Sequence, residues 1–298
     1  MATDIDGVIQ SYAEYLGESH PQNFGRFEGL CVSDREAALA EAIVFRMLQT
    51  IQVRPEIHDQ PQTGGPDFVC SCWRGPLFKP QPQDRFVVEA TSLSIDAVTN
   101  RSGIPNEVPD DISGGAYGLV TQNIVNKAKA KTPQLGNYLM PRVLAIVSSH
   151  VAVPALFNEA TAKWALVSDP YWKHEIGSDV TDTAEYTNLE KSVFIRPGPD
   201  GRIEPCRQSI SAILLVAVYG DKSKVLGILH PEPAYPLNVE FLPKIPFVRI
   251  SRWPIIDGKI FTEWVVGSPS GQNFPHVFVR RKRDHRNQTF PNSPVSST

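Results

Sequence analysis

The sequence predicts an α/β fold, in which helices cover a sheet that has apolar strands at its centre. Three stretches of the chain predict it. Residues 37–49 (AALAEAIVFRMLQ) have the high helix propensity of a long, well-formed helix. Residues 85–93 (RFVVEATSL) alternate in the manner of a strand. Residues 142–149 (RVLAIVSS) are almost continuously apolar, which is typical of a central strand that is covered on both faces.

Length and composition indicate a globular protein. The chain has 298 residues, of which 41% are hydrophobic and 20% are charged, so it can bury a substantial core. The longest apolar run, residues 210–219, is much shorter than the roughly 18 residues of a membrane span. The N-terminus is acidic and has no signal-peptide pattern. We therefore expect a cytoplasmic protein with no membrane partner.

The expected domain organisation is one elaborated α/β domain over residues 1–275, with a core at about 33–149 and elaborations at 150–275. Residues 276–298 contain the basic run RRKRDHR followed by a Ser, Pro and Asn-rich end, and we expect them to be a disordered tail. Such a tail could simply aid solubility or could contact phosphates without regard to base sequence. The net charge of −3 excludes general electrostatic binding of nucleic acid by the whole surface.

The elements of the first half follow in order. A helix is expected at 5–16, then a Gly, Pro and Asn-rich loop to residue 30. Ser33 and Glu36 fit a capping box at the start of the next helix. Downstream we expect strands at 51–57, 68–73 and 85–93, a loop at 100–115, a helix at 116–131 stopped by Pro133, and a strand at 142–149.

The second half is less regular. A helix is expected at 155–165, and two further strands at 209–219 and 224–229 are joined by a turn at 220–223. Residues 231–275 are rich in proline and show little periodicity. The two strands at 209–219 and 224–229 are expected to be C-terminal additions to the sheet.

Two acidic residues stand out. Glu89 interrupts an apolar strand, and a carboxylate in such a place requires a cationic side chain or a metal ion as partner. Asp67 follows the turn residues 64–66 (GGP) at the entrance of the preceding strand. If the two strands pair as a hairpin, these carboxylates lie on neighbouring strands. Oxygen ligands of this kind suit a divalent cation.

The pair Pro66-Asp67, followed after a hairpin-sized gap by Glu89-Ala90-Thr91, resembles the signature of the PD-(D/E)XK nuclease superfamily. The resemblance covers about residues 33–149. It implies a restriction-endonuclease-like core (helix, three strands, helix, strand) with a mixed sheet. It also implies that Asp67 and Glu89 bind Mg²⁺ or Mn²⁺ during phosphodiester hydrolysis.

The sequence departs from that signature at Thr91, where the superfamily usually has a lysine. Some members take the lysine from the following helix, and the run QNIVNKAKAKT offers three candidates. Helical spacing places Lys127 and Lys131 on one stripe at the edge of the apolar face, and Lys129 toward solvent. Lys127 is the first choice and Lys131 the second, although each could instead belong to a solvated basic face.

Glu41 is a third acidic candidate. Unlike Glu36, it has no role in a capping box, and its helix face is otherwise apolar. The resemblance implies that a glutamate from this helix can support the metal. An ion-paired or partly extended structural glutamate is the alternative.

Other chemistries are disfavoured. The chain contains no P-loop, no Gly-x-Gly-x-x-Gly after a strand and no Gly-x-Ser-x-Gly elbow. Its four cysteines do not have the spacing of a zinc site, and the His58-Asp59 pair is as well explained by structure as by function.

The expected function is therefore a metal-dependent nuclease, acting on DNA rather than RNA, with a homodimer as one way to reach both strands. The alternative is a nuclease-like binding or assembly subunit without catalysis, in which Thr91 records the lost lysine.

Overall fold

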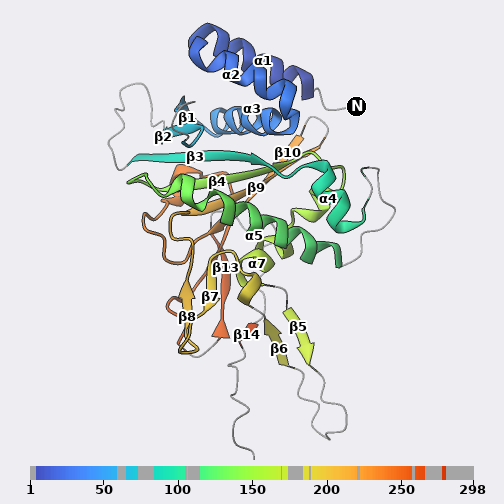
Figure 1. Cartoon of the computed structure of the whole chain (residues 1–298). Helices are drawn as coiled ribbons and strands as arrows, with labels where there is room; N and C mark the ends of the chain where they lie inside the picture. The colour runs from blue at the N-terminus through green and yellow to red at the C-terminus, as the bar shows by residue number, and fades with distance from the viewer. Residues whose placement is uncertain are drawn as a thin grey trace, which may run out of the picture.

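The computed structural model describes residues 5–58, 65–72, 84–104, 106, 115–168, 170–173, 184–187, 189–219, 222–256, 259–265 and 277–279. An eight-stranded sheet lies between two layers of helices, as Figure 1 shows with the sheet seen nearly edge-on. The predicted α/β class and mixed sheet are confirmed. No helix within the described ranges is both long and apolar enough to cross a membrane.

The large sheet is mixed because hairpins and crossovers alternate along it. The strand order is β1-β2-β3-β4-β9-β10-β11-β13. β3 pairs in parallel with β4, and β4 in parallel with β9, whereas β1–β2, β2–β3 and β9–β10 are antiparallel pairs. The strands are β1 Val53–Ile57, β2 Phe68–Cys72, β3 Arg85–Ser92, β4 Arg142–Ser148, β9 Ala212–Tyr219, β10 Lys222–Leu229, β11 Phe247–Ile250 and β13 Thr262–Val265.

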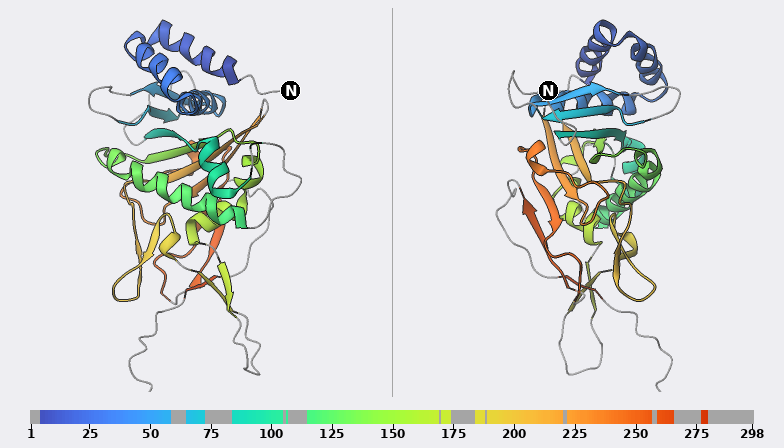
Figure 2. Two further views of the ribbon diagram at one scale, coloured as in Figure 1. Left: turned by 45° about the vertical axis from the view of Figure 1, so that its right-hand side comes forward. Right: turned by 90° about the vertical axis from the view of Figure 1, so that its left-hand side faces the viewer.

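One face of this sheet is covered by the N-terminal helices α1 Ile5–Ser19, α2 Pro21–Ser33 and α3 Arg35–Thr50. Figure 2 shows α3 next to the sheet, with α1 and α2 stacked outside it. The core below α3 is formed by alternate strand residues, among them Val88, Val143 and Leu214. These helices therefore bury one side of the central strands.

The opposite face is covered by α4 Ile95–Ser102, α5 Gly115–Leu135, α6 Val153–Leu156 and α7 Glu159–Val167. Its core takes the other set of strand residues, including Val87, Leu144 and Ile213. The pleat thus separates Val87 from Val88, as the alternation of this strand predicts. Glu89 and Thr91, which are in phase with Val87, belong to the side of α5.

The predicted order of helix, three strands, helix and strand is present as α3, β1, β2, β3, α5 and β4, with α4 inserted. The hairpin expected from the spacing of Asp67 and Glu89 is also present, since β2 and β3 pair antiparallel with Phe68 opposite Val88. These contacts are local in sequence, which is why the pattern could predict them.

Two predictions near the N-terminus are wrong. Residues 21–33 form α2 instead of a loop: Pro21 begins the helix, and the fully buried Phe27 packs edge-on against Tyr12 at 4.9 Å between ring centroids. The N-cap of α3 is Asp34, whose side chain accepts from the Ala37 amide at 2.9 Å, so Ser33 and Glu36 form no capping box.

Two predictions in the middle of the chain also fail. The expected loop at 100–115 begins later, because α4 reaches Ser102, with Ser94 as N-cap and Gly103 as the left-handed residue after its end. Residues 105 and 107–114 of that loop lie outside the described residues. Pro133 does not stop α5, which continues to Leu135, because a proline in the last turn removes only one helical hydrogen bond.

The elaborations at 150–275 extend the fold. The expected helix at 155–165 is two helices, α6 and α7, separated at the N-cap Asn158. The strands β9 and β10 form the expected antiparallel hairpin. The proline-rich segment adds β11 and β13 to the sheet, although its sequence has little periodicity.

Smaller sheets complete the lower part of the molecule in Figure 1. One contains β5 Pro170–Lys173, β6 Ala184–Thr187, β12 Lys259–Ile260 and β14 Val277–Val279, and the other contains β7 Ile195–Pro197 and β8 Ile203–Pro205. β14 lies inside the expected disordered tail and pairs with β6 and β12, so that prediction is wrong for residues 277–279. Residues 276 and 280–298 lie outside the described residues.

Candidate active site

Asp67 and Glu89 lie side by side because of the β2–β3 register. Phe68 is opposite Val88, so the residue before Phe68 reaches the level of the residue after Val88. The Asp67 carboxylate accepts a hydrogen bond from the Ala90 amide, with 2.7 Å between Oδ2 and N. This bond fixes one carboxylate of the predicted pair against the strand that carries the other.

Glu89 is held by two side chains from the end of α5. The Lys131 ammonium lies 2.6 Å from Glu89 Oε1, and the Gln134 amide nitrogen donates to Oε2 at 3.1 Å. Only 3% of Glu89 is exposed, whereas Lys131 is partly exposed. The buried carboxylate therefore has an opposite charge and an amide donor on its two oxygens, as burial requires.

Gln134 connects this ion pair to the turn before β2. Its amide nitrogen also donates to the carbonyl of Gly65 at 2.8 Å, and its amide oxygen accepts from Lys131 at 3.1 Å. Gly65 itself faces Tyr138, since a Cβ at this position would lie 2.7 Å from the Tyr138 hydroxyl oxygen. The turn, the strand and the helix end are thereby held in one network.

The carboxyl group of Asp67 has a pKa well above its usual range. Desolvation is the largest cause, and the negative charges of Glu89 and Glu41 add to it, while the Ala90 amide and Arg26 act in the opposite direction. Within the described part of the chain, no basic side chain forms an ion pair with Asp67. A cation placed beside Asp67 would therefore favour the ionised form of its carboxyl group.

Glu41, the third acidic candidate, is occupied by residues of the N-terminal helices. One terminal nitrogen of Arg26 lies 2.7 Å from both of its carboxylate oxygens, and the Tyr12 hydroxyl donates to Oε1 at 3.0 Å. Burial and the nearby charges of Glu41 and Asp67 raise the pKa of Tyr12 above its ordinary value. The structure thus places Glu41 in an ion pair with Arg26, close enough to Asp67 for their charges to interact.

The three candidate lysines of α5 differ in their contacts and in their exposure. Lys131, the second choice from the sequence, contacts Glu89, and Lys127, the first choice, does not. Lys127 is half-buried one helical turn away, and Lys129 is exposed. Burial and the proximity of Lys131 lower the pKa of Lys127. Helical spacing identified the stripe correctly, but the position of α5 along β3 selects the member that reaches the carboxylate.

A divalent metal would find two carboxylate ligands here. Within the ranges that the structure describes, no three His, Cys, Asp or Glu side chains form a group able to hold a metal ion. Mg²⁺ commonly binds through one or two carboxylates and keeps water and substrate phosphate as its other ligands. Asp67 and Glu89 fit that pattern, and Glu41, the third candidate ligand, is paired with Arg26.

Sequence reasoning missed Gln134, Arg26 and Tyr12. Gln134 follows Lys131 by three residues, so the same helical spacing that selected the lysines could have found it. Arg26 and Tyr12 gave no comparable signal, because their contacts with Glu41 depend on how α1 and α2 pack on α3.

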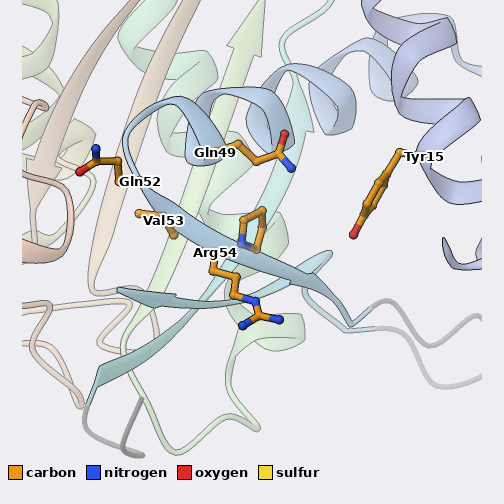
Figure 3. Close-up of a pocket in the computed structure, with 6 residues that line it drawn as sticks. Tyr15, Gln49, Gln52, Val53 and Arg54 are labelled. Carbon is orange, nitrogen blue, oxygen red and sulfur yellow. The ribbon is translucent and has the colours of Figure 1, made fainter. Parts of the chain in front are cut away.

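The backbone of His58 contacts the candidate pair, since its amide donates to the Asp67 carbonyl at 2.9 Å. The His58 ring packs edge-on against Tyr138, and Asp59 lies outside the described residues. A pocket of about 500 Å³ lies at the edge strand β1, lined by Tyr15, Gln49, Gln52, Val53, Arg54 and Pro55. Figure 3 shows the side chain of Tyr15 across the pocket from β1, and none of the predicted site residues lines it.

Comparisons with protein-family models, with curated proteins and with solved structures gave no match.

Proposed function

We propose that this chain is a divalent-metal-dependent phosphodiesterase that cuts nucleic acid. The observation that carries the proposal is the pair of carboxylates on adjacent strands, Asp67 and Glu89, with Lys131 in contact with Glu89. The order of elements around the pair and its resemblance to PD-(D/E)XK nucleases support the same conclusion. DNA is favoured over RNA on that resemblance.

Asp67 and Glu89 would hold Mg²⁺ or Mn²⁺. The chemistry that such an ion supplies is polarisation of a phosphoryl oxygen and a lower pKa for a bound water. The protein would then need to provide only oxygen ligands and one well-placed cation. Desolvation, with the negative charges of Glu89 and Glu41, raises the pKa of Asp67, and a bound cation would oppose these effects.

Lys131 would act on the reacting phosphate. Its ammonium is partly exposed and adjacent to Glu89, so it can orient the attacking water and stabilise the negative charge that develops on phosphate oxygens. Gln134 would keep Lys131 and Glu89 in position through its contacts with both. Lys131 would thereby replace the lysine that is absent at Thr91.

The test is a cleavage assay on supercoiled plasmid and on single-stranded DNA, with Mg²⁺, with Mn²⁺ and with a chelator. Asp67→Asn and Glu89→Gln keep the size of each side chain and remove its charge, and Lys129→Ala is the control for a charge change on exposed α5 surface. We expect metal-dependent cutting by the wild type and the control, and at least a hundredfold loss in both carboxylate variants. Undiminished cutting by Asp67→Asn would overturn the proposal.

A stability measurement supplies an independent readout. Asparagine at position 67 can still accept the Ala90 hydrogen bond but has no charge to be repelled by Glu89 and Glu41. We therefore expect Asp67→Asn to unfold at higher temperature than the wild type without metal, and to gain nothing from Mg²⁺. Saturating Mg²⁺ should stabilise the wild type by about 2.7 kcal/mol at a hundred times the dissociation constant.

A binding or assembly subunit without catalysis is the second candidate. It is favoured by one observation: Glu89 is already paired with Lys131 and Gln134, as a purely structural carboxylate would be. In that case the wild type would neither cut DNA nor be stabilised by Mg²⁺ or Mn²⁺. Such a result would direct the search toward a protein or nucleic-acid partner.

A further inference from the structure

Lys127 occupies a distinctive place on α5. It lies on the same side of the helix as Lys131 and Gln134, the two residues that contact Glu89. Four residues separate it from Lys131, which corresponds to one helical turn and about 6 Å along the axis. Lys127 is therefore the next cation on this side of the helix from the candidate site.

The direction of α5 is opposite to that of β3. Because β3 and β4 are parallel, the helix that connects them runs back in the opposite direction. Two contacts position the C-terminal half of α5: Lys131 reaches Glu89 on β3, and Asn123 donates to the carbonyl of Ala97 in α4. Lys127 lies between Asn123 and Lys131 on the helix.

The ammonium of Lys127 has no hydrogen bond or ion pair within the described part of the chain, although the residue is half-buried. Two acidic residues at the start of α3, the N-cap Asp34 and Glu36, act on it at longer range. Both are engaged elsewhere: Asp34 caps α3 through the Ala37 amide, and Glu36 accepts from the Ile95 amide at 2.9 Å. A partly desolvated cation that none of the described side chains pairs suits an anionic ligand.

We propose that Lys127 binds the backbone phosphate next to the scissile one, so that Lys127 and Lys131 contact successive phosphates of one nucleic-acid strand. This inference rests on the proposed function and deepens it. Lys127 is then a substrate-binding residue, and Lys131 alone acts on the reacting phosphate. The two lysines are one turn apart along the helix, about 6 Å, which is comparable to the spacing of neighbouring phosphates along a strand.

The chain offers a matched control in Lys129. Lysine-to-alanine substitution at 127 or at 129 removes the same charge from the same helix, but Lys129 is exposed on a different side. Alanine preserves helix propensity at both positions. A difference between the two variants therefore reports the direction of the side chain rather than the net charge.

The experiment measures binding of a labelled single-stranded oligonucleotide and of its duplex in the presence of chelator, where no metal-dependent cutting occurs. The dissociation constant is measured over a range of salt concentrations for the wild type, Lys127→Ala, Lys129→Ala and Lys127→Arg. Loss of one phosphate contact should reduce the slope of log K against log salt by about 0.7 for single strands or 0.9 for duplex. We expect that loss for Lys127→Ala, a smaller change for Lys129→Ala, and a slope close to wild type for Lys127→Arg.

Cleavage kinetics then separate binding from chemistry. We expect Lys127→Ala to raise KM about tenfold with kcat within a factor of two, and Lys131→Met to lower kcat. Equal slopes for Lys127→Ala and Lys129→Ala, or a loss of kcat in Lys127→Ala as large as in Lys131→Met, would overturn the inference. A wild type that binds DNA through Lys127 in chelator but never cuts with metal would instead refute the proposed catalysis and leave this contact standing.

Discussion

The Lys131 ammonium and the Glu89 carboxylate lie 2.6 Å apart, although 42 residues separate them in the sequence. The pair joins α5 to β3 and brings a cation into contact with Glu89 at the candidate site. The two members of the pair differ in exposure: Glu89 is buried, and Lys131 is partly exposed.

Lys131→Met should remove catalysis and also reduce stability. Loss of the ammonium should lower kcat at least about a hundredfold, as removal of a charge-stabilising donor commonly does. It also leaves a buried carboxylate without its cation, which costs about 3 kcal/mol. The double variant Lys131→Met/Glu89→Gln should regain stability without regaining activity. Urea unfolding and the plasmid assay measure the two effects, and wild-type cutting by Lys131→Met would assign the cation elsewhere.

Glu41 should prove to be a structural residue. Its side chain is only 5% exposed and is paired with Arg26, which is 28% exposed. Arg26→Met should therefore destabilise the fold by about 3 kcal/mol, because it leaves a buried charge uncompensated, and Arg26→Met/Glu41→Gln should recover much of that loss. Glu41→Gln should keep kcat within about threefold of wild type. A hundredfold loss of kcat in a well-folded Glu41→Gln would restore Glu41 to the metal site.

His230 should make the fold less stable as the pH falls below 6.5. The Glu232 amide donates to Nδ1 at 2.9 Å, so Nε2 carries the proton of the neutral ring and donates to the Cys206 carbonyl at 2.9 Å. Burial is the main cause that lowers the pKa of His230 to about 4.

Between pH 6.5 and 4 the unfolded chain binds a proton at this residue and the folded chain does not. The free energy of unfolding should therefore be fully retained above pH 6.5 and decrease by on the order of 3 kcal/mol as the pH falls to about 4. Urea unfolding across that range measures the change. His230→Gln should show a smaller decrease, and an identical pH profile for the two proteins would contradict this assignment.

Gly227 should tolerate no side chain. It is opposite Phe247 in the parallel pair of β10 and β11, and a Cβ at Gly227 would lie 2.0 Å from Cδ1 of that fully buried ring. Gly227→Ala should thus destabilise the fold by about 3 kcal/mol. Gly25→Ala is the matched control, since nothing lies within 4 Å of its Cβ and alanine favours helix α2 by about 1 kcal/mol. Chemical unfolding compares the two, and equal stabilities would contradict the close approach.

Several features could be read from the sequence because they depend on neighbours along the chain. The alternation around Glu89 separated the two faces of β3, and the turn before Asp67 indicated a strand that returns beside it. Together they brought the two carboxylates to adjacent strands. Predictions failed where a neighbouring residue made the contact instead. The capping box predicted at Ser33 is an example, because Asp34 caps α3.

Other features were decided only by the tertiary structure. Which of Lys127 and Lys131 contacts Glu89 depends on the position of α5 along β3. The periodicity of the helix sequence does not specify that position. The pairing of Glu41 with Arg26 depends on the packing of α2 against α3. Burial at these places follows from contacts between segments distant in sequence, and burial determines which charges must find partners. The sequence by itself determined the candidate carboxylates, and the packing of helices on the sheet decided which cations reach them.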